Sequence, residues 1–319
     1  MAMSKAQKRN YAKTKDEESR TKWFDNLAKG IEGDSLPWRK PWKPQAGGSS
    51  CMPINFASKR AYRGGNIVSL WVRAMCEGWD DLRFGTRNQL KNAGYSIKGL
   101  TNDVGATIKL FKPTVWEKKN EDGETEKRQG MVLRWYTVFC VEQCEDYVAP
   151  VPDETDDDVE VMPESEMMEL FQQYVDSQSS LTFKRAGGQA YYRSSNDQIV
   201  LPPHESFTDP VGEVMTAMHE ASHSTGHSTR LNRPLGNGFG SQAYAYEELI
   251  AELSSLIVTL TLGGEFKPGI VAEENANSVA YLQSWLKACK EQDKALDKAF
   301  SDAQKSADFI LATLEGDAQ

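Results

Sequence analysis

Residues 219–223 read His-Glu-Ala-Ser-His, an HExxH motif inside a segment whose apolar spacing predicts a helix over residues 211–225. Side chains four residues apart lie on one face of an α-helix, so His219 and His223 can present two imidazole nitrogens to a single divalent ion. Glu220 is placed to act as a general base on water at such a site. Three of the four histidines lie between positions 219 and 227, which favours a metal site over two ordinary surface histidines.

A third protein ligand is required, because a catalytic zinc takes three side chains and keeps one position open. The next predicted helix, residues 242–260, carries Glu248 and Glu252 four positions apart. In zincins with a glutamate ligand, that ligand lies on the helix after the motif, and an acidic residue four positions later steadies a ligating histidine. This layout predicts Glu248 as the ligand and Glu252 as the residue that supports a ligating histidine by a hydrogen bond; two solvated carboxylates are the plain alternative.

Two other residues are alternative third ligands. The run HEASHSTGH approaches the pattern HExxHxxGxxH, which requires a histidine at position 229, but Thr229 stands there. His227 is therefore expected to hydrogen-bond near the metal or line the cleft rather than to ligate. Glu247 is the weaker alternative because it is out of phase with Glu252.

Together these residues predict a zinc metallopeptidase, with Zn²⁺ or another divalent ion such as Mn²⁺ as the cofactor; whether the site is active stays open. Glu220 is the candidate base. Tyr244 precedes Glu248 by four residues and shares its helical face, so its hydroxyl is a candidate donor to the oxyanion. An ordinary packed tyrosine is an equal alternative.

The net charge of −9 hides an asymmetry between the two halves of the chain. Residues 1–149 hold 26 Lys and Arg against 18 Asp and Glu, a balance of +8, whereas residues 150–319 hold 11 against 28, a balance of −17. Seven of the eight tryptophans also lie in the first half. The Pro-rich, acidic segment at residues 149–164 is typical of a linker and coincides with the change in charge.

The pattern of elements predicts a two-domain α+β protein. A disordered basic tail (residues 1–15), a first domain (16–148), the linker (149–164) and a mostly helical second domain (165–319) follow one another. In the first domain we expect helices over 16–31 and 66–76, a short helix capped by Thr86, and a long hairpin whose strands, 105–116 and 131–141, are joined by 117–130. In the second we expect helices over 164–178, 211–225 and 242–260, strands over 189–193 and 198–201, and a long amphipathic tail over 277–314.

The first domain interleaves cations with aromatic rings, the combination that single-stranded DNA binding without sequence preference requires. Each such cluster is weak evidence alone, because exposed Lys and Arg are usually solvated and aromatic residues usually belong to the core. Nothing matches a helix-turn-helix or zinc-finger pattern, so sequence-specific duplex reading is not expected. The candidate DNA-binding residues are Trp38, Arg39, Lys40, Trp42, Lys43, Arg60, Tyr62, Arg63, Arg87, Lys109 and Lys112.

The remaining composition indicates a cytoplasmic protein. The five cysteines are scattered and odd in number, which favours reduced thiols over a disulfide framework. No apolar run approaches the length of a bilayer span, and the basic N-terminus lacks the apolar core of a secretory signal. We expect no membrane partner.

Most of the chain resembles the ArdC-type antirestriction proteins of conjugative plasmids and phages. The matching stretches are PWRKPW (37–42), PINFASKRAYRGGN (53–66), FGTRNQLKNAG (84–94), HEASHSTGHSTRLNR (219–233), YAYEELIAEL (244–253) and the tail 281–311. The resemblance implies an N-terminal domain that binds single-stranded DNA, a zincin-like metallopeptidase domain, and protection of incoming DNA from host restriction in the bacterial cytoplasm. It also supports His219, His223 and Glu248 as ligands and Glu220 as the base.

Two further functions remain as alternatives. The protein could coat single-stranded DNA and use its metal site only as a structural element. It could also be a SprT-like protease that is activated by DNA and clears protein from it, in which case a DNA-bound protein, rather than a restriction enzyme, is the substrate. The antirestriction peptidase and the SprT-like protease would use the same metal-site chemistry, so the site residues do not distinguish these two hypotheses.

Overall fold

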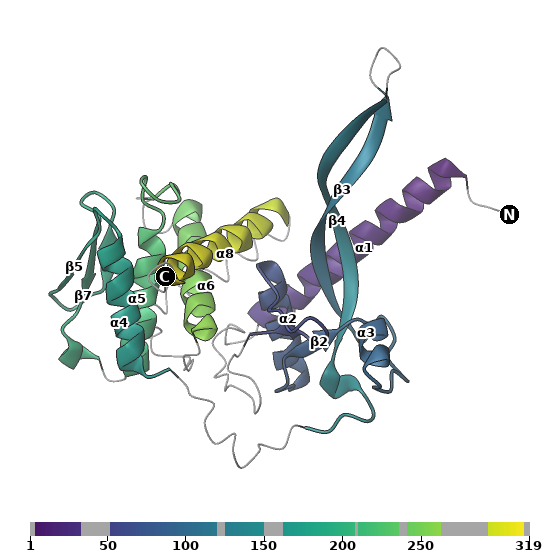
Figure 1. The fold of residues 1–319 in the computed structure, drawn as a ribbon, viewed down its shortest axis with the longest axis horizontal. Coiled ribbons are helices and arrows are strands. Elements are labelled where there is room, and N and C mark those ends of the chain that lie inside the picture. Colours follow the sequence, from purple (N-terminus) through teal and green to yellow (C-terminus); the bar gives the residue numbers. More distant parts are fainter. Residues whose placement is uncertain are drawn as a thin grey trace.

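The computed structural model describes residues 4–32, 52–119, 125–149, 162–207, 210–235, 241–262 and 293–315. It has two α+β halves, each with its own small sheet, which confirms the predicted fold class. Figure 1 shows the long hairpin of the N-terminal half projecting away from the rest of the molecule, and the helices of the C-terminal half packed beside a short sheet. None of the helices within these residues is long and apolar enough to cross a membrane.

The first helix, α1 (Lys5–Glu32), begins well before the predicted start. Residues 5–15, expected to be a disordered tail, belong to this helix. The Ser4 hydroxyl accepts a hydrogen bond from the backbone N–H of Gln7 (3.2 Å), and the Gln7 side chain accepts one from the Ser4 N–H (2.9 Å). This capping box satisfies donors that the first helical turn would otherwise leave unpaired, which explains a helix start at Lys5.

The N-terminal sheet has the strand order β1-β2-β4-β3. The predicted hairpin is confirmed, with β3 (Ala106–Lys119) and β4 (Thr125–Cys140) paired antiparallel from Ala106↔Val138 to Lys119↔Thr125. Both strands run further into the charged connecting segment than we expected. Two short strands, β1 (Ile54–Asn55) and β2 (Arg83–Gly85), extend the sheet at its base and were not predicted, because two or three residues show no alternation.

The two predicted helices of this region are confirmed as α2 (Gly65–Glu77) and α3 (Arg87–Asn92), and they lie at the base of the sheet. Thr86 caps α3 in a capping box with Gln89. Apolar side chains from α2, β2 and β4 meet in one core, with Trp71, Phe84 and Phe139 fully buried.

The C-terminal half packs helices against a three-stranded sheet of order β5-β7-β6. The predicted helices are confirmed as α4 (Glu164–Ser177), α5 (Pro210–Ser224) and α6 (Gln242–Thr261), and the predicted strands as β6 (Tyr191–Arg193) and β7 (Gln198–Leu201). Strand β5 (Thr182–Arg185), parallel to β7, was not predicted. The amphipathic tail is described from residue 293, where it forms α8 (Asp293–Glu315).

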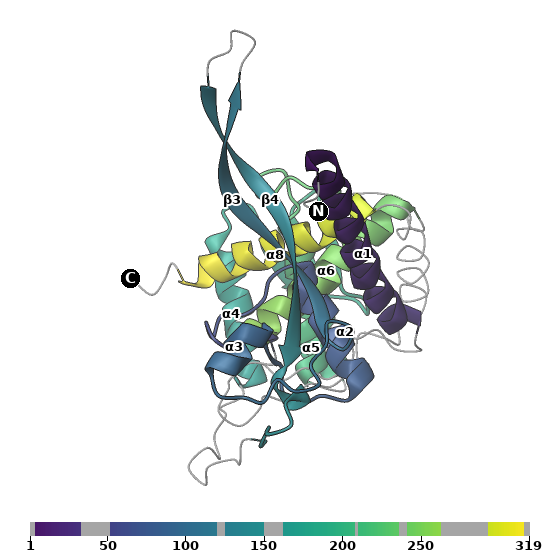
Figure 2. The same ribbon diagram turned by 90° about the vertical axis from the view of Figure 1, so that its right-hand side faces the viewer.

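Helix α8 packs against both halves of the protein, as the view in Figure 2 also indicates. On one side, the hydroxyl of Ser306 lies 2.8 Å from that of Thr225, just after α5. On the other side, residues spaced along one face of α8 contact the N-terminal half: Asp297 pairs with Lys109, Phe300 packs edge-on against Trp23, Gln304 accepts from the Gly64 N–H, and Asp308 pairs with Arg63.

Candidate metal centre and nucleic-acid surface

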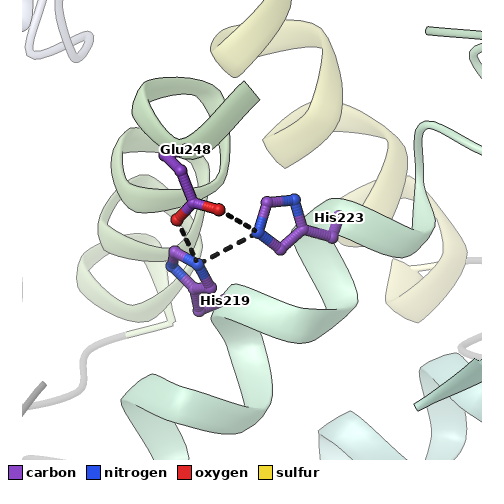
Figure 3. A group of neighbouring side chains, drawn as sticks. All are labelled: His219, His223 and Glu248. Carbon is purple, nitrogen blue, oxygen red and sulfur yellow. Dashed lines mark hydrogen bonds and ion pairs between the residues drawn. The ribbon is translucent and has the colours of Figure 1, made fainter. Parts of the chain in front are cut away.

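Helix α5 presents both histidines of the HExxH motif on one face (Figure 3). Their rings meet edge to face with centroids 4.7 Å apart, and their Nε2 atoms are 3.1 Å apart. The helix can bury almost its whole length because its small polar residues bond back to its own backbone: Ser222 donates to the Met218 carbonyl at 2.8 Å. The two imidazoles are therefore held on a rigid, buried element.

Glu248 comes from the neighbouring helix α6 and completes a cluster of three ligand-type residues (Figure 3). Its Oε2 lies 3.5 Å from His219 Nε2, and its Oε1 lies 3.6 Å from His223 Nε2. One ligand atom from each of the three residues lies within 4.8 Å of the others. Two imidazole nitrogens and one carboxylate oxygen form the donor set of a three-ligand catalytic zinc site, so the residues present fit a divalent metal ion.

The electrostatics of the cluster couple Glu248 to the histidines. Burial alone would lower the pKa of His219, but the hydrogen bond and charge of Glu248 outweigh it and raise that pKa to about 9. Burial alone would raise the pKa of Glu248, but the bond to His219 and the charges of both histidines bring it down to about 2. The site therefore favours an ionised carboxylate and, in the absence of metal, a bound proton, which a cation would replace.

The two candidate catalytic residues lie beside this cluster. Glu220 is only 7% exposed, and burial raises the pKa of its carboxyl group, while the nearby histidines oppose that effect. Tyr244 hydrogen-bonds the Glu248 carboxylate, and burial together with the Glu248 charge raises the pKa of its phenol. The predicted oxyanion donor thus contacts the predicted ligand.

Glu247, for which we predicted no supporting role, lies beside His223; that Glu252 steadies a ligating histidine stays a prediction. Glu247 Oε1 lies 3.3 Å from His223 Nδ1, on the ring edge that points away from the cluster. Glu252 lies one turn further along α6, and its charge raises the pKa of His219. The prediction missed Glu247 because it considered this residue only as a metal ligand.

His227 lies outside the three-residue cluster. Its Nδ1 is 2.9 Å from the Thr229 hydroxyl and 3.8 Å from Asp197 Oδ2. These contacts agree with a hydrogen-bonding residue in the loop after α5 and give it no contact with His219 or His223 among the interactions the structure records.

The predicted DNA-binding residues lie in different environments. Tyr62, Arg87 and Lys109 are engaged within the protein: Tyr62 accepts from Asn55 Nδ2 (3.1 Å), Arg87 bonds the Leu100 carbonyl, and Lys109 pairs with Asp297 while its Nζ lies 3.7 Å from the Trp23 ring centroid. Arg63 is exposed but pairs with Asp308.

Arg60 and Lys112 are the candidates best exposed for a ligand. Lys112 lies on the hairpin, with its Nζ 5.5 Å from the centroid of Tyr136, so cation and aromatic ring are adjacent there. The remaining candidates, Trp38, Arg39, Lys40, Trp42 and Lys43, lie outside the residues that the structure describes.

Comparison with known proteins matches both halves. Residues 17–139 match the family described as the N-terminal domain of anti-restriction factor ArdC, and residues 169–302 match the family of zincin-like metallopeptidases. Protein y4eC of Sinorhizobium fredii is 31% identical over 293 residues, which cover 91% of this chain and 90% of that protein. Two Escherichia coli proteins named DNA primase TraC are each 30% identical over 90% of this chain, although the matches span only 19% and 26% of the primases.

Solved structures give the same result. The metal-free structure of the antirestriction protein ArdC from plasmid R388 superposes with a TM-score of 0.70 at 30% identity, covering 92% of this chain and 97% of ArdC. Its Mn(II)-bound form gives a TM-score of 0.69 at 29% identity over the same shares of the two chains. Both family models match in order, and the matches to y4eC and to ArdC of plasmid R388 cover at least 90% of each chain. The chain therefore belongs to the ArdC family of antirestriction proteins with a zincin-like metallopeptidase domain.

Proposed function

We propose that this protein protects incoming DNA from restriction, binding single-stranded DNA with its N-terminal half and carrying a metal-dependent peptidase site in its C-terminal half. The observation that carries the proposal is the meeting of His219, His223 and Glu248, whose ligand atoms lie within 4.8 Å of one another. The donor set suits Zn²⁺, and the Mn(II)-bound ArdC relative supports Mn²⁺ as an alternative ion.

The residues around the centre have distinct roles in this proposal. When bound, a divalent cation supplies Lewis acidity and lowers the pKa of water. Glu220 takes a proton from the water that attacks the scissile carbonyl and passes it to the leaving amine. Its raised pKa suits both steps, because an acid–base group works best when its pKa is near the operating pH. Tyr244 keeps its proton and donates a hydrogen bond to the Glu248 carboxylate; once this carboxylate ligates a cation, the O–H is free to donate to the oxyanion instead.

The proposal for DNA rests on charge and composition. The first 149 residues carry a balance of +8, and the exposed Arg60 and Lys112 lie on this half, Lys112 with its Nζ 5.5 Å from the centroid of the Tyr136 ring. The relatives named ArdC and DNA primase are associated with DNA by their names, which supports the same partner here. A protein that protects incoming DNA would act in the cytoplasm of the bacterial host.

The test combines metal analysis with DNA titration on the purified full-length protein. We expect the wild type to hold about one divalent ion per chain, Glu248→Ala to lose it, and Glu220→Gln to keep it but lose protection against restriction. A labelled single-stranded oligonucleotide should bind more weakly as salt rises, with a log–log slope of roughly −0.7 for each phosphate contacted. Arg60→Ala and Lys112→Ala should flatten that slope, whereas Lys184→Ala, an exposed lysine of the other half, should not.

The outcomes separate the alternatives. If Glu220→Gln protects DNA as well as the wild type, the metal site is structural and the protein acts by coating DNA. If single-stranded DNA stimulates cleavage of proteins bound to DNA, the hypothesis of a SprT-like, DNA-activated protease is supported. If the wild type binds no divalent ion even after metal is added, the peptidase half of the proposal is wrong.

A further inference from the structure

A buried arginine lies directly behind the metal cluster. Arg233 belongs to the loop between α5 and α6, and its side chain is 6% exposed. Its Nε and Nη2 donate to the two oxygens of Glu247, at 2.9 and 2.6 Å. Two parallel bonds of this kind fix the plane of a carboxylate, which a lysine ammonium cannot do because it lacks the planar fork.

The same guanidinium also holds the C-terminal end of α5. Its Nη1 donates to the Thr225 hydroxyl at 2.7 Å, and its Nη2 donates to the Ser222 carbonyl at 2.9 Å. These two acceptors flank His223 in the chain. Arg233 therefore connects the helix that carries the histidines to the helix that carries Glu248, through four hydrogen bonds that satisfy a buried charge.

Glu247 passes this constraint on to His223. Its Oε1 lies 3.3 Å from His223 Nδ1, whereas His223 Nε2 faces His219 and Glu248. A neutral imidazole has one N–H, so a carboxylate fixed at Nδ1 keeps the proton there and leaves the Nε2 lone pair for a metal ion. Without the fork of Arg233, the Glu247 carboxylate could rotate and the ring could lose its orientation.

We propose that Arg233 is a positioning residue of the metal centre: it fixes Glu247, which orients His223 with Nε2 directed at the metal position. The inference rests on the proposed metal site and assigns Arg233 no contact with substrate. It also gives a role to Glu247, a buried glutamate directly beside Glu248 on α6.

The test compares Arg233→Lys and Arg233→Met with matched variants of Arg230. Arg230 lies in the same loop with an equally buried side chain, and it also bonds the end of α5, through the Ser224 carbonyl, but its carboxylate partner is Asp197 and not Glu247. Apparent dissociation constants for Zn²⁺ and Mn²⁺ are measured by competition with a chelating indicator, well below the melting temperature of each variant. Both Arg233 variants should bind each ion roughly 10- to 100-fold more weakly, the usual effect of losing support behind a ligating histidine.

The Arg230 variants should lose thermal stability but keep metal affinity close to the wild type. A second measurement needs no metal: ¹⁵N chemical shifts of the His223 ring should report Nδ1 protonation in the wild type and a mixture of tautomers in Arg233→Lys. Folded Arg233 variants with wild-type affinity and an unchanged tautomer would overturn the inference, as would an equal loss of affinity in the Arg230 variants. If the wild type itself bound no metal, the proposed function would fail, and the tautomer would still decide the role of Arg233.

Discussion

Asp197 and Arg230 form a buried ion pair beneath the loop that follows α5. Arg230 Nη1 donates to Asp197 Oδ2 at 3.0 Å, and the hydroxyls of Ser180 and Tyr192 donate to the same carboxylate at 2.6 and 2.7 Å. Burial would raise the pKa of Asp197, but the bond to Arg230 and these hydroxyls lower it from 3.8 to about 2. The ionised carboxylate is therefore strongly favoured in the folded state.

This pKa shift predicts an acid-sensitive contribution to stability. A carboxyl group with a lowered folded-state pKa stabilises the protein above its unfolded pKa, near 4, and the contribution disappears as the pH falls towards 2. From the shift in pKa, Asp197 should contribute roughly 2 kcal/mol at neutral pH. In urea melts, the stability difference between wild type and Asp197→Asn should be large at pH 7 and shrink between pH 4 and pH 2.5. A difference that stays constant over that range would contradict the assignment.

At the same residue scale, the sequence predicts some of the site and misses other parts for a physical reason. His219 and His223 lie in one helical turn, so their spacing alone places them together, and Glu248 follows from the layout of the next helix. The Arg233–Glu247–His223 contacts join three separate segments, and no local period reports them. The sequence does carry one signal, the adjacent pair Glu247 and Glu248, because adjacent side chains point about 100° apart on a helix. Where both directions are buried, the second carboxylate requires a buried cation as its partner.

Helix α6 carries Tyr244, Glu247 and Glu248 within its first two turns, so the stability of its N-terminus bears on the site. Ser241 is the N-cap, and its hydroxyl accepts a hydrogen bond from the Tyr244 N–H at 3.1 Å. This bond satisfies one of the backbone donors that a helix start leaves open.

Replacing this cap should weaken the protein by a predictable amount. Ser241→Ala should lower the free energy of unfolding by about 1 kcal/mol, and Ser241→Asp should restore most of it, because aspartate is an equally good cap. Urea denaturation of the three proteins, with metal removed by chelation, measures the difference. Equal stability of Ser241→Ala and wild type would show that the hydroxyl does not cap α6 in solution.

The sequence correctly predicted the helices and strands that are long and have a periodic pattern of apolar residues. Helices α2, α4, α5 and α6 and the β3–β4 hairpin were predicted near their observed bounds because each shows a sustained apolar pattern. Strands β1, β2 and β5 were missed because each is short and none pairs with an element that follows it directly in the sequence, whereas the equally short β6 and β7 pair as neighbours along the chain. The extension of α1 to Lys5 depends on Ser4 and Gln7, a capping signal within a segment that reads as a basic tail.

On the scale of the whole molecule, α8 joins the two halves through opposite charges. The N-terminal half is basic and the C-terminal half acidic, and α8 places Asp297 against Lys109 and Asp308 against Arg63. Lys109 and Arg63 were both predicted to bind DNA. Carboxylates of α8 therefore occupy cations that a phosphate backbone would seek, and the two partners would compete for them.

This competition predicts that removing the α8 carboxylates raises DNA affinity. The double variant Asp297→Asn with Asp308→Asn should bind a labelled single-stranded oligonucleotide up to about fivefold more tightly at low salt. This gain is the equivalent of roughly 1 kcal/mol, the contribution of an exposed ion pair such as Arg63–Asp308. The gain should shrink as salt rises, because screening weakens the contacts of exposed charges. Fluorescence anisotropy over a range of salt measures both effects.

The matched control is Asp302→Asn on the same helix. Asp302→Asn removes one negative charge, as does each of the single variants Asp297→Asn and Asp308→Asn, but the Asp302 carboxylate accepts from the Tyr246 hydroxyl (2.8 Å) and lies within the C-terminal half. The affinity of the Asp302→Asn variant for DNA should remain closer to that of the wild type. If the double variant bound no better than Asp302→Asn, Lys109 and Arg63 would serve only to dock α8. The DNA contacts would then have to come from other cations of the N-terminal half, with Arg60 and Lys112 as the first to test.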